Sequence, residues 1–248
     1  FDYIISSLKE INYDGRISLN LFNEPMASKN IYSNIKNLSQ ELPNAILSLN
    51  SNGDYIKSTE SLKKLDTSGL KEILITMHTP KNKKWNREYS EKQMIRFAKK
   101  VNFKIDKSHL KDLKFAFFVG KLHVEVFCTD WASQGNSRGG ELKNLTPKKN
   151  RITPCEKPIR EFVISYDGAV QLCCHIYHNK TYNKTIETID PKTSKSIFQI
   201  YASKVLTESR KSLFDYSEKK GVCAKCNHYE DDIKQDSNFF YDAEDESK

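Results

Sequence analysis

The 248-residue sequence has no long hydrophobic run and few cysteines, and both features exclude whole classes of protein. No apolar stretch approaches the ~18–20 residues that a membrane-spanning helix needs. The chain opens on an amphipathic pattern without a signal peptide. Six cysteines are too few for a disulfide scaffold in a chain of this length. We therefore expect a cytoplasmic protein with reduced, metal-binding thiols and no membrane partner.

The sequence also lacks a Walker-type glycine loop and a G-x-S-x-G motif. Its net charge of +8 is uneven, because residues 230–248 hold eight acidic and two basic residues and the rest of the chain carries +14. The positive charge of residues 1–229 suggests anionic partners. However, the positive residues are mostly scattered lysines without the interleaved aromatics that nucleic-acid binding favours. We therefore interpret them as solvated and do not expect a nucleic-acid partner.

Four of the six cysteines form two pairs on separate segments. Cys155 and Cys173 are separated by 17 residues, and Cys223 and Cys226 form a C-x2-C motif after a further 49 residues. Such pairs are typical of four-thiolate metal sites. Buried core cysteines are the alternative, but Cys223 and Cys226 lie in a polar, lysine-rich stretch. The pattern predicts a metal or iron–sulfur centre, and spacing alone does not separate Zn(Cys)4 from [4Fe–4S].

Short apolar runs alternate with amphipathic helical patterns over the first half of the chain. The predicted strands are 16–22, 45–49, 72–77, 101–105 and 122–127. The predicted helices are 1–11, 30–41, 58–65, 90–100 and 108–119. This alternation is typical of βαβ units, so we expect an α/β fold with a parallel sheet. The first helix has no strand before it, which suggests a sixth unit upstream of Phe1.

The pattern changes in the second half of the chain. Residues 162–173 predict a β-hairpin, because Asp167-Gly168 between two β-branched runs supplies the positive-φ residue of a tight turn. This hairpin would bring Cys155 close to Cys173, and a predicted helix over 196–216 leads to the C-x2-C motif. The expected organisation is a barrel-like domain at 1–130, a linker loop at 131–154, a cluster-binding module at 155–229 and an acidic, disordered tail at 230–248.

The cysteine-rich segment resembles the auxiliary-cluster domain of radical S-adenosylmethionine enzymes. As a pattern it reads C-x12-G-x4-C from Cys155 through Gly168 to Cys173, a gap, and then C-x2-C. The longer SPASM form continues with further cysteines and holds two clusters, whereas no cysteine follows Cys226, so the chain is more similar to the one-cluster "twitch" form. The resemblance implies one auxiliary [4Fe–4S] cluster on Cys155, Cys173, Cys223 and Cys226, with Cys128 and Cys174 as spare thiols.

The first half of the chain is similar to the same family, whose fold is a partial (β/α)6 barrel. Asn23-Glu24-Pro25 resembles the Gly-Gly-Glu-Pro segment that holds the amino group of S-adenosylmethionine, although Asn23 stands where the family has glycine. Ser51-Asn52-Gly53 resembles a Thr-Asn-Gly turn, and Thr76 resembles the Ser/Thr that faces the ribose and carboxylate of the cofactor. The resemblance implies an incomplete parallel (β/α)6 barrel with a small C-terminal β-hairpin and helix module. The implied S-adenosylmethionine-binding residues are Asn23, Glu24, Pro25, Ser51, Asn52 and Thr76.

The defining C-x3-C-x2-C motif of the family is absent, since no cysteine precedes Cys128. We expect it upstream of Phe1, together with the missing first strand, so that the chain is a truncated fragment without catalytic activity of its own. For the full-length protein the resemblance implies S-adenosylmethionine, a second [4Fe–4S] cluster and an electron donor such as flavodoxin or ferredoxin. The substrate would be a sugar, a cyclitol or a peptide, oxidised with the help of the auxiliary cluster.

The competing interpretation is a catalytically degenerate binding module with a structural Zn(Cys)4 site, contacting RNA through its basic body. In that interpretation His228, two residues past Cys226, is a candidate Cys3His zinc ligand. His175 and His178 flank the hairpin and are interpreted as ordinary surface histidines, the alternative being that they donate to the cluster or replace a ligand. Trp131 and Arg138 are candidates for the border of a substrate pocket.

Overall fold

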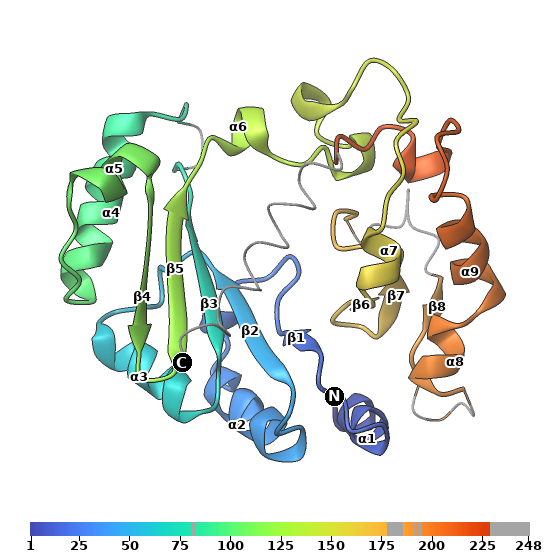
Figure 1. The fold of residues 1–248 in the computed structure, drawn as a ribbon, viewed down its shortest axis with the longest axis horizontal. Coiled ribbons are helices and arrows are strands. Elements are labelled where there is room, and N and C mark those ends of the chain that lie inside the picture. Colours follow the sequence, from blue (N-terminus) through green and yellow to red (C-terminus); the bar gives the residue numbers. More distant parts are fainter. Residues whose placement is uncertain (81–82, 178–185, 191, 193–194, 229–248) are drawn as a thin grey trace, which may run out of the picture. The chain divides into compact units, whose positions relative to one another are not determined.

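The computed structural model describes residues 1–80, 83–177, 186–190, 192 and 195–228. The chain divides into two compact units, Phe1–Trp131 and Ala132–Lys248, and each unit has its own sheet (Figure 1). Within the described ranges, no helix combines the length and the hydrophobicity that crossing a membrane requires. The acidic tail and His178 lie outside the described residues.

The first unit is built on a five-stranded sheet in the order β1-β2-β3-β5-β4. The strands are β1 (Arg16–Ser18), β2 (Ile46–Ser51), β3 (Glu72–Met77), β4 (Lys114–Val119) and β5 (Leu122–Cys128). The helices are α1 (Asp2–Glu10), the 3-10 helix η1 (Pro25–Ala27), α2 (Ile31–Glu41), α3 (Thr59–Thr67), α4 (Arg87–Lys100) and α5 (Lys107–Asp112). Four strands run parallel and β4 pairs antiparallel with β5. The predicted α/β fold with a parallel sheet is therefore confirmed.

Hydrophobic side chains at alternate strand positions form the core of this unit. Burial alternates along β3, where Ile73 and Ile75 are almost fully buried. Helices α2, α3 and α4 lie along one side of the sheet (Figure 1). The core contains Leu47, Leu49, Ile73, Ile75, Val124 and Val126 from the strands and Ile35, Leu38, Leu62, Leu65, Met94 and Phe97 from the helices. The loops that follow β1, β2 and β3 meet at the carboxyl edge of the sheet, where α/β proteins bind ligands.

Two predictions in this unit are wrong. Residues 101–105 form no strand, because Asn102 adopts a left-handed conformation (φ 57°) after α4. Phe103 instead stacks on Phe115, with ring centroids 4.7 Å apart. The predicted helix 108–119 is half helix and half strand, since Leu113 is also left-handed (φ 51°) and ends α5.

Strand β4 is antiparallel because of the turn that follows it. Gly120 has a φ of +63°, and the chain enters β5 only two residues later at Leu122. A parallel connection needs a crossover of a dozen or more residues, so this short turn forces a hairpin. The turn is held by Asp66, whose carboxylate accepts a hydrogen bond from the backbone N–H of Lys121 at 2.9 Å.

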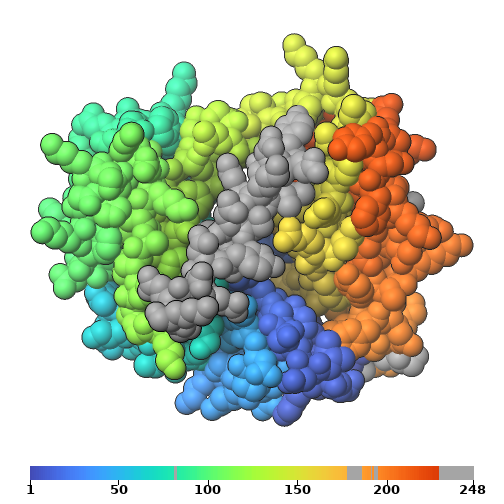
Figure 2. Space-filling model, viewed as in Figure 1, coloured from blue at the N-terminus to red at the C-terminus, as the bar shows by residue number. Residues whose placement is uncertain are grey.

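The second unit contains a three-stranded antiparallel sheet, β6-β7-β8. The strands are β6 (Val163–Ile164), β7 (Ala169–Gln171) and β8 (Glu187–Thr188). The remaining elements from residue 131 on are α6 (Trp131–Gln134), η2 (Arg138–Gly140), η3 (Lys143–Leu145), α7 (Lys157–Arg160), α8 (Ile197–Tyr201), α9 (Lys204–Lys211) and η4 (Gly221–Cys223). Figure 2 shows α8 and α9, in orange, at the surface of this unit.

The predicted hairpin at 162–173 is confirmed, with Gly168 at its turn (φ +83°). A Cβ atom at Gly168 would come within 2.9 Å of the Ile189 carbonyl oxygen, so the turn requires glycine. The single helix predicted over 196–216 is wrong, because it divides into α8 and α9. Ser203 caps the second helix by accepting a hydrogen bond from the N–H of Leu206 at 3.4 Å.

Candidate functional site

The four cysteines singled out in the sequence line one cavity in the second unit. The cavity and its opening hold about 390 Å³ of space outside protein atoms. Apolar side chains of Pro158, Ile176, Leu213 and Val222 form part of its wall. Its other lining residues are Gly139, Arg151, Cys155, Lys157, Cys173, His175, Cys223, Cys226 and His228. Cys174, next to Cys173 in sequence, is not among the described residues that line the cavity.

Three separate segments deliver the thiols to this cavity. Cys155 precedes α7 and is tied to the segment after α9, because its N–H donates to the Leu213 carbonyl at 2.8 Å. Cys173 follows β7, the second strand of the hairpin. Cys223 ends η4, and the N–H of Cys226 donates to the Cys223 carbonyl at 3.3 Å, so the C-x2-C motif forms a compact turn.

The loop before α7 supports this turn. Ser137 is fully buried, and its hydroxyl donates to the Lys225 carbonyl at 2.8 Å. Gly139 packs against the turn with a φ of +68°, and a Cβ atom there would approach the Val222 carbonyl oxygen to 3.1 Å. The segment 131–154, predicted as a linker, thus contributes Ser137, Gly139 and Arg151 to the surroundings of the thiols.

The four thiols share one cavity without forming a ready-made site for a single metal ion. Among the described residues, no group of three or more histidine, cysteine, aspartate or glutamate side chains is close enough together to hold one metal ion. The four thiols nevertheless line the same cavity. An iron–sulfur cluster takes its thiolates at separate iron corners, whereas zinc takes four donors at ~2.3 Å from one centre.

Burial raises the pKa of three of the four cavity thiols. It raises the pKa of Cys155, raises that of Cys173 far above the ordinary range, and raises the pKa of Cys223 to about 12. Buried apolar surroundings disfavour a bare thiolate. Binding of a metal or cluster would therefore displace protons from thiols that are otherwise neutral.

Nitrogen donors surround the sulfur atoms, and most of them converge on Cys226. Its Sγ lies 3.4 Å from the backbone N of His228, 3.9 Å from Nη1 of Arg151 and 4.0 Å from Nδ2 of Asn136. The backbone N–H groups of Lys157 and His175 point at the sulfurs of Cys155 and Cys173, where they oppose the rise in pKa. Hydrogen bonds to sulfur are one of the factors that set the potential of iron–sulfur centres.

The interpretation of His175 as a surface residue is wrong. It lines the cavity, and burial, reinforced by nearby Lys157, lowers its pKa to about 2, so the ring is neutral. Nδ1 of His175 lies 3.0 Å from the Asn136 amide nitrogen, which makes Nδ1 the hydrogen-bond acceptor. The ring of His228 lies edge-on to it at 4.8 Å and is 97% buried. The sequence does not reveal this pair, because the two histidines are brought together by the hairpin and the C-x2-C turn.

A second group of predicted residues meets at the carboxyl edge of the first unit's sheet. The Glu24 carboxylate accepts hydrogen bonds from Ser51 Oγ at 2.9 Å, the N–H of Asn52 at 2.6 Å and the N–H of Met26 at 3.0 Å. Glu24 therefore connects the loop after β1 to the end of β2, and its oxygens are already used within the protein.

The other predicted residues of this group occupy neighbouring positions. Asn23 accepts a hydrogen bond from the N–H of Leu21 at 2.9 Å, and Pro25 begins η1. Thr76 is half-buried on β3, one residue beyond Ile75, which pairs with Ser51. The structure thus brings Glu24, Ser51 and Asn52 into contact and places Thr76 on the adjacent strand.

His78 is a candidate residue at this edge that the sequence reasoning missed. It follows β3 and is exposed, and partial desolvation of its ring lowers its pKa against the opposing fields of Asp54 and Glu24. Its ring lies 6.0 Å from that of Trp131, a residue already considered for a substrate pocket. Its position directly after a predicted parallel strand is the signal that could have identified it.

Comparisons with known proteins agree with this arrangement. Residues 155–227, which include all four cavity cysteines, match the family model described as SPASM, an iron-sulfur cluster-binding domain. The chain is 22% identical over 226 residues to an S-adenosyl-L-methionine-dependent 2-deoxy-scyllo-inosamine dehydrogenase of Niallia circulans. That match covers 91% of this chain and 78% of the relative.

Two solved structures share the fold. The crystal structure of BtrN in complex with AdoMet and 2-DOIA has a TM-score of 0.63 at 20% identity and covers 92% of this chain and 78% of that one. The crystal structure of selenomethionine BtrN in an open conformation has a TM-score of 0.56 at 18% identity with the same coverage. Together the matches confirm the resemblance to radical S-adenosylmethionine enzymes with an auxiliary-cluster domain.

Proposed function

We propose that this chain is part of a radical S-adenosylmethionine oxidoreductase and that its second unit holds one auxiliary [4Fe–4S] cluster on Cys155, Cys173, Cys223 and Cys226. The observation that carries the proposal is the convergence of these four thiols, from three separate segments, on one cavity. The match of residues 155–227 to an iron–sulfur domain supports it independently.

The residues around the cavity suit a cluster in three respects. The four thiols line one cavity, apolar side chains form part of its wall, and N–H groups point at the sulfurs. Four thiolates leave no open coordination position, which favours electron transfer over direct binding of substrate. When bound, such a cluster would supply a one-electron acceptor for substrate oxidation.

For the first unit we propose binding of S-adenosylmethionine at the carboxyl edge of the sheet. Asn23, Glu24 and Pro25 would present backbone carbonyls to its ammonium group, while Ser51, Asn52 and Thr76 would contact other polar parts. Glu24 would act by holding the two loops together, since its carboxylate binds Ser51 and Asn52. In this proposal the sheet is part of an incomplete (β/α)6 barrel.

The proposed substrate is a small polar molecule of the cyclitol or sugar class, because the relative named above is a 2-deoxy-scyllo-inosamine dehydrogenase. The chain has no cysteine before Cys128. It therefore does not itself supply the three thiolates that hold the S-adenosylmethionine-cleaving cluster in the resembled family. We expect these 248 residues to bind the auxiliary cluster without turning over substrate.

Anaerobic reconstitution with iron and sulfide tests the proposal. We expect about four irons and four sulfides per chain in the wild type. Cys223→Ala and Cys226→Ala should lose most of this iron, because each removes one of the four ligands. The absorbance of the thiolate–iron band provides a second readout.

Cys174→Ala is the matched control. It removes a thiol adjacent to Cys173 that does not line the cavity among the described residues, so its iron content should equal that of the wild type. Uptake of one zinc per chain without sulfide would contradict the proposal and favour the structural zinc interpretation. Equal iron loss in Cys174→Ala and Cys223→Ala would contradict the assigned ligand set.

A further inference from the structure

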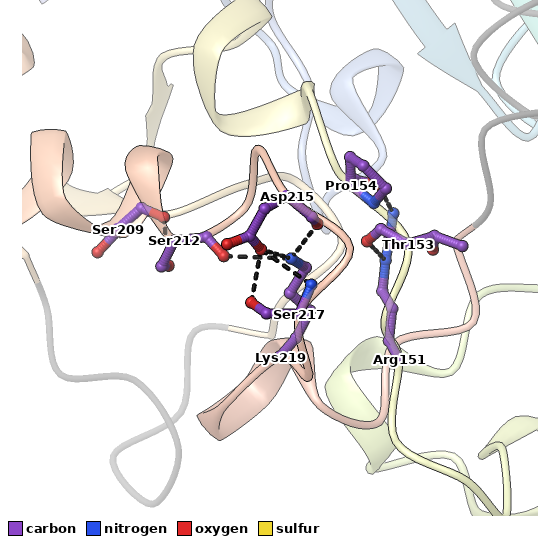
Figure 3. Close-up of polar contacts among 8 residues, drawn as sticks. All are labelled: Arg151, Thr153, Pro154, Ser209, Ser212, Asp215, Ser217 and Lys219. Atoms are coloured by element: carbon purple, nitrogen blue, oxygen red, sulfur yellow. Dashed lines mark hydrogen bonds and ion pairs between the residues drawn. The ribbon is translucent and has the colours of Figure 1, made fainter.

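Arg151 is a buried cation beside the cysteine cavity. Its side chain extends along the chain that leads to Cys155, and the residue is only 6% exposed. Nε donates to the Thr153 carbonyl at 2.9 Å and Nη2 donates to the Pro154 carbonyl (Figure 3). Nη1 lies 3.9 Å from Sγ of Cys226. Within the described residues no carboxylate pairs with this guanidinium.

The other buried cations of this unit differ from Arg151 in this respect. Lys157 pairs with Glu161, and Lys219 pairs with Asp215, each with a nitrogen–oxygen distance of 2.9 Å. Lys219 also donates to the carbonyls of Ser212 and Asp215 (Figure 3). Each lysine therefore has an internal counter-charge. A buried charge without a counter-charge is costly, and among the described residues Arg151 has only carbonyl oxygens and a sulfur as partners.

The backbone fixes Arg151 at this position. Its N–H donates to the Ala224 carbonyl at 2.8 Å, within the C-x2-C turn, and its carbonyl accepts from the N–H of Lys219 at 2.8 Å. Arg151 is thus held by two backbone hydrogen bonds, with Nη1 of its guanidinium near Sγ of Cys226.

We propose that Arg151 is the counter-charge of the auxiliary cluster at its Cys226 corner and that it raises the reduction potential of that cluster. A cluster with four thiolates is anionic and gains one more negative charge when it is reduced. A fixed positive charge in a poorly hydrated site therefore stabilises the reduced form more than the oxidised form. This inference rests on the proposed cluster, and it assigns a role to a residue that is not a ligand.

The test is an anaerobic redox titration of the reconstituted chain with dithionite, followed by EPR of the reduced cluster. Arg151→Gln should keep the bulk of the side chain and remove its charge. We expect an at least tenfold lower ratio of reduced to oxidised cluster at a fixed potential, which corresponds to a fall of about 59 mV for a one-electron couple. Asn136→Ala, which removes a neutral donor to the same sulfur, should produce a smaller shift.

Arg210→Gln is the matched control. Arg210 lies in the same unit and also donates to backbone carbonyls, those of Pro158 and Tyr201, but it does not line the cavity. Its loss should leave the potential unchanged. If Arg151→Gln fails to retain iron, the potential of Arg151→Lys, which keeps the positive charge, is the test instead. A potential within about 59 mV of the wild type supports the counter-charge, and a larger fall overturns it.

The two proposals fail in different ways. A wild-type chain that assembles no iron–sulfur cluster would overturn the proposed function and the inference with it. A wild-type chain with about four irons, together with an Arg151→Gln variant of unchanged potential, would overturn only the role of Arg151. A shift in Arg210→Gln as large as that in Arg151→Gln would also overturn it, because a general loss of stability would then explain both.

Discussion

Ser137 and Asn227, 90 residues apart in sequence, hydrogen-bond each other twice. The N–H of Ser137 donates to the side-chain carbonyl of Asn227 at 2.7 Å, and the N–H of Asn227 donates to the Ser137 hydroxyl at 3.2 Å. Asn227 follows Cys226 directly, so this reciprocal pair fixes the end of the C-x2-C turn. The turn thereby depends on a loop that the sequence alone suggests is only a linker.

Ser137→Ala should destabilise the second unit. The substitution leaves the Lys225 carbonyl and the Asn227 N–H without the Ser137 hydroxyl in a buried site. An unsatisfied buried polar group costs about 1–3 kcal/mol, so the free energy of unfolding should fall by about that amount. Urea denaturation followed by circular dichroism measures it. Ser209→Ala, whose hydroxyl bonds only within helix α9 among the described contacts, should have a much smaller effect; equal effects would contradict the role of Ser137.

Glu24→Ala should loosen the carboxyl edge of the first unit's sheet. It removes the acceptor shared by Ser51 Oγ and the N–H of Asn52. Hydrogen bonds to charged groups contribute about 1.5–3 kcal/mol, so we expect a loss of about that size in the free energy of unfolding. Glu60→Ala, an exposed residue 3.6 Å from Lys63, is the control and should change stability by less than about 1 kcal/mol. An unchanged denaturation midpoint in Glu24→Ala would contradict the role of Glu24 in connecting the loop after β1 to the end of β2.

Asp215 should make the stability of the second unit sensitive to acid. Hydrogen bonds from Ser217, and then from Lys219, hold the pKa of Asp215 below its ordinary range. A lowered carboxylate pKa stabilises the fold fully above about pH 4, and this stabilisation is lost as the pH falls towards the folded-state pKa. Urea midpoints measured between about pH 2 and pH 6 should therefore fall less steeply in Asp215→Asn than in the wild type. Glu208→Gln, at an exposed helix position, should retain the wild-type slope.

Cys128 should be unreactive in the folded protein. It is buried at the end of β5, and burial raises its pKa to about 12. At pH 8 only about one thiol in 10⁴ would then be ionised, and the thiolate is the reactive form. Iodoacetamide labelling followed by mass spectrometry should modify Cys128 only after unfolding in urea. Equally fast labelling in the folded and unfolded chains would show that this edge of the sheet opens readily.

Much of the architecture follows from local patterns. The alternation of apolar positions in β3 and the apolar faces of α2 and α3 are periodic, and periodicity depends on nearest neighbours in the sequence. The turn at Gly168 is equally local, because only glycine tolerates its backbone conformation at little cost. These elements were predicted correctly for that reason.

The errors occur where tertiary contacts override local patterns. Phe103 lies in an apolar run typical of a strand, but its ring fills the core from a loop by stacking on Phe115. Leu110, Leu113 and Phe117 satisfy a helical spacing, whereas Phe115 and Phe117 alternate as in a strand. The turn at Gly120 selects the strand. Short apolar runs are ambiguous in this way because helix and strand periods agree over few residues.

The sequence by itself determined the identity of the four thiols, the hairpin between the first two and the parallel α/β pattern, because each is encoded in spacing or periodicity. Only the tertiary structure decided what surrounds the thiols. The contact between the rings of His175 and His228, the hydrogen bonds between Ser137 and Asn227 and the approach of Arg151 to Cys226 join segments far apart in the chain. No local pattern specifies such contacts, since they arise from the packing of the whole unit, and burial then sets the charge of each group.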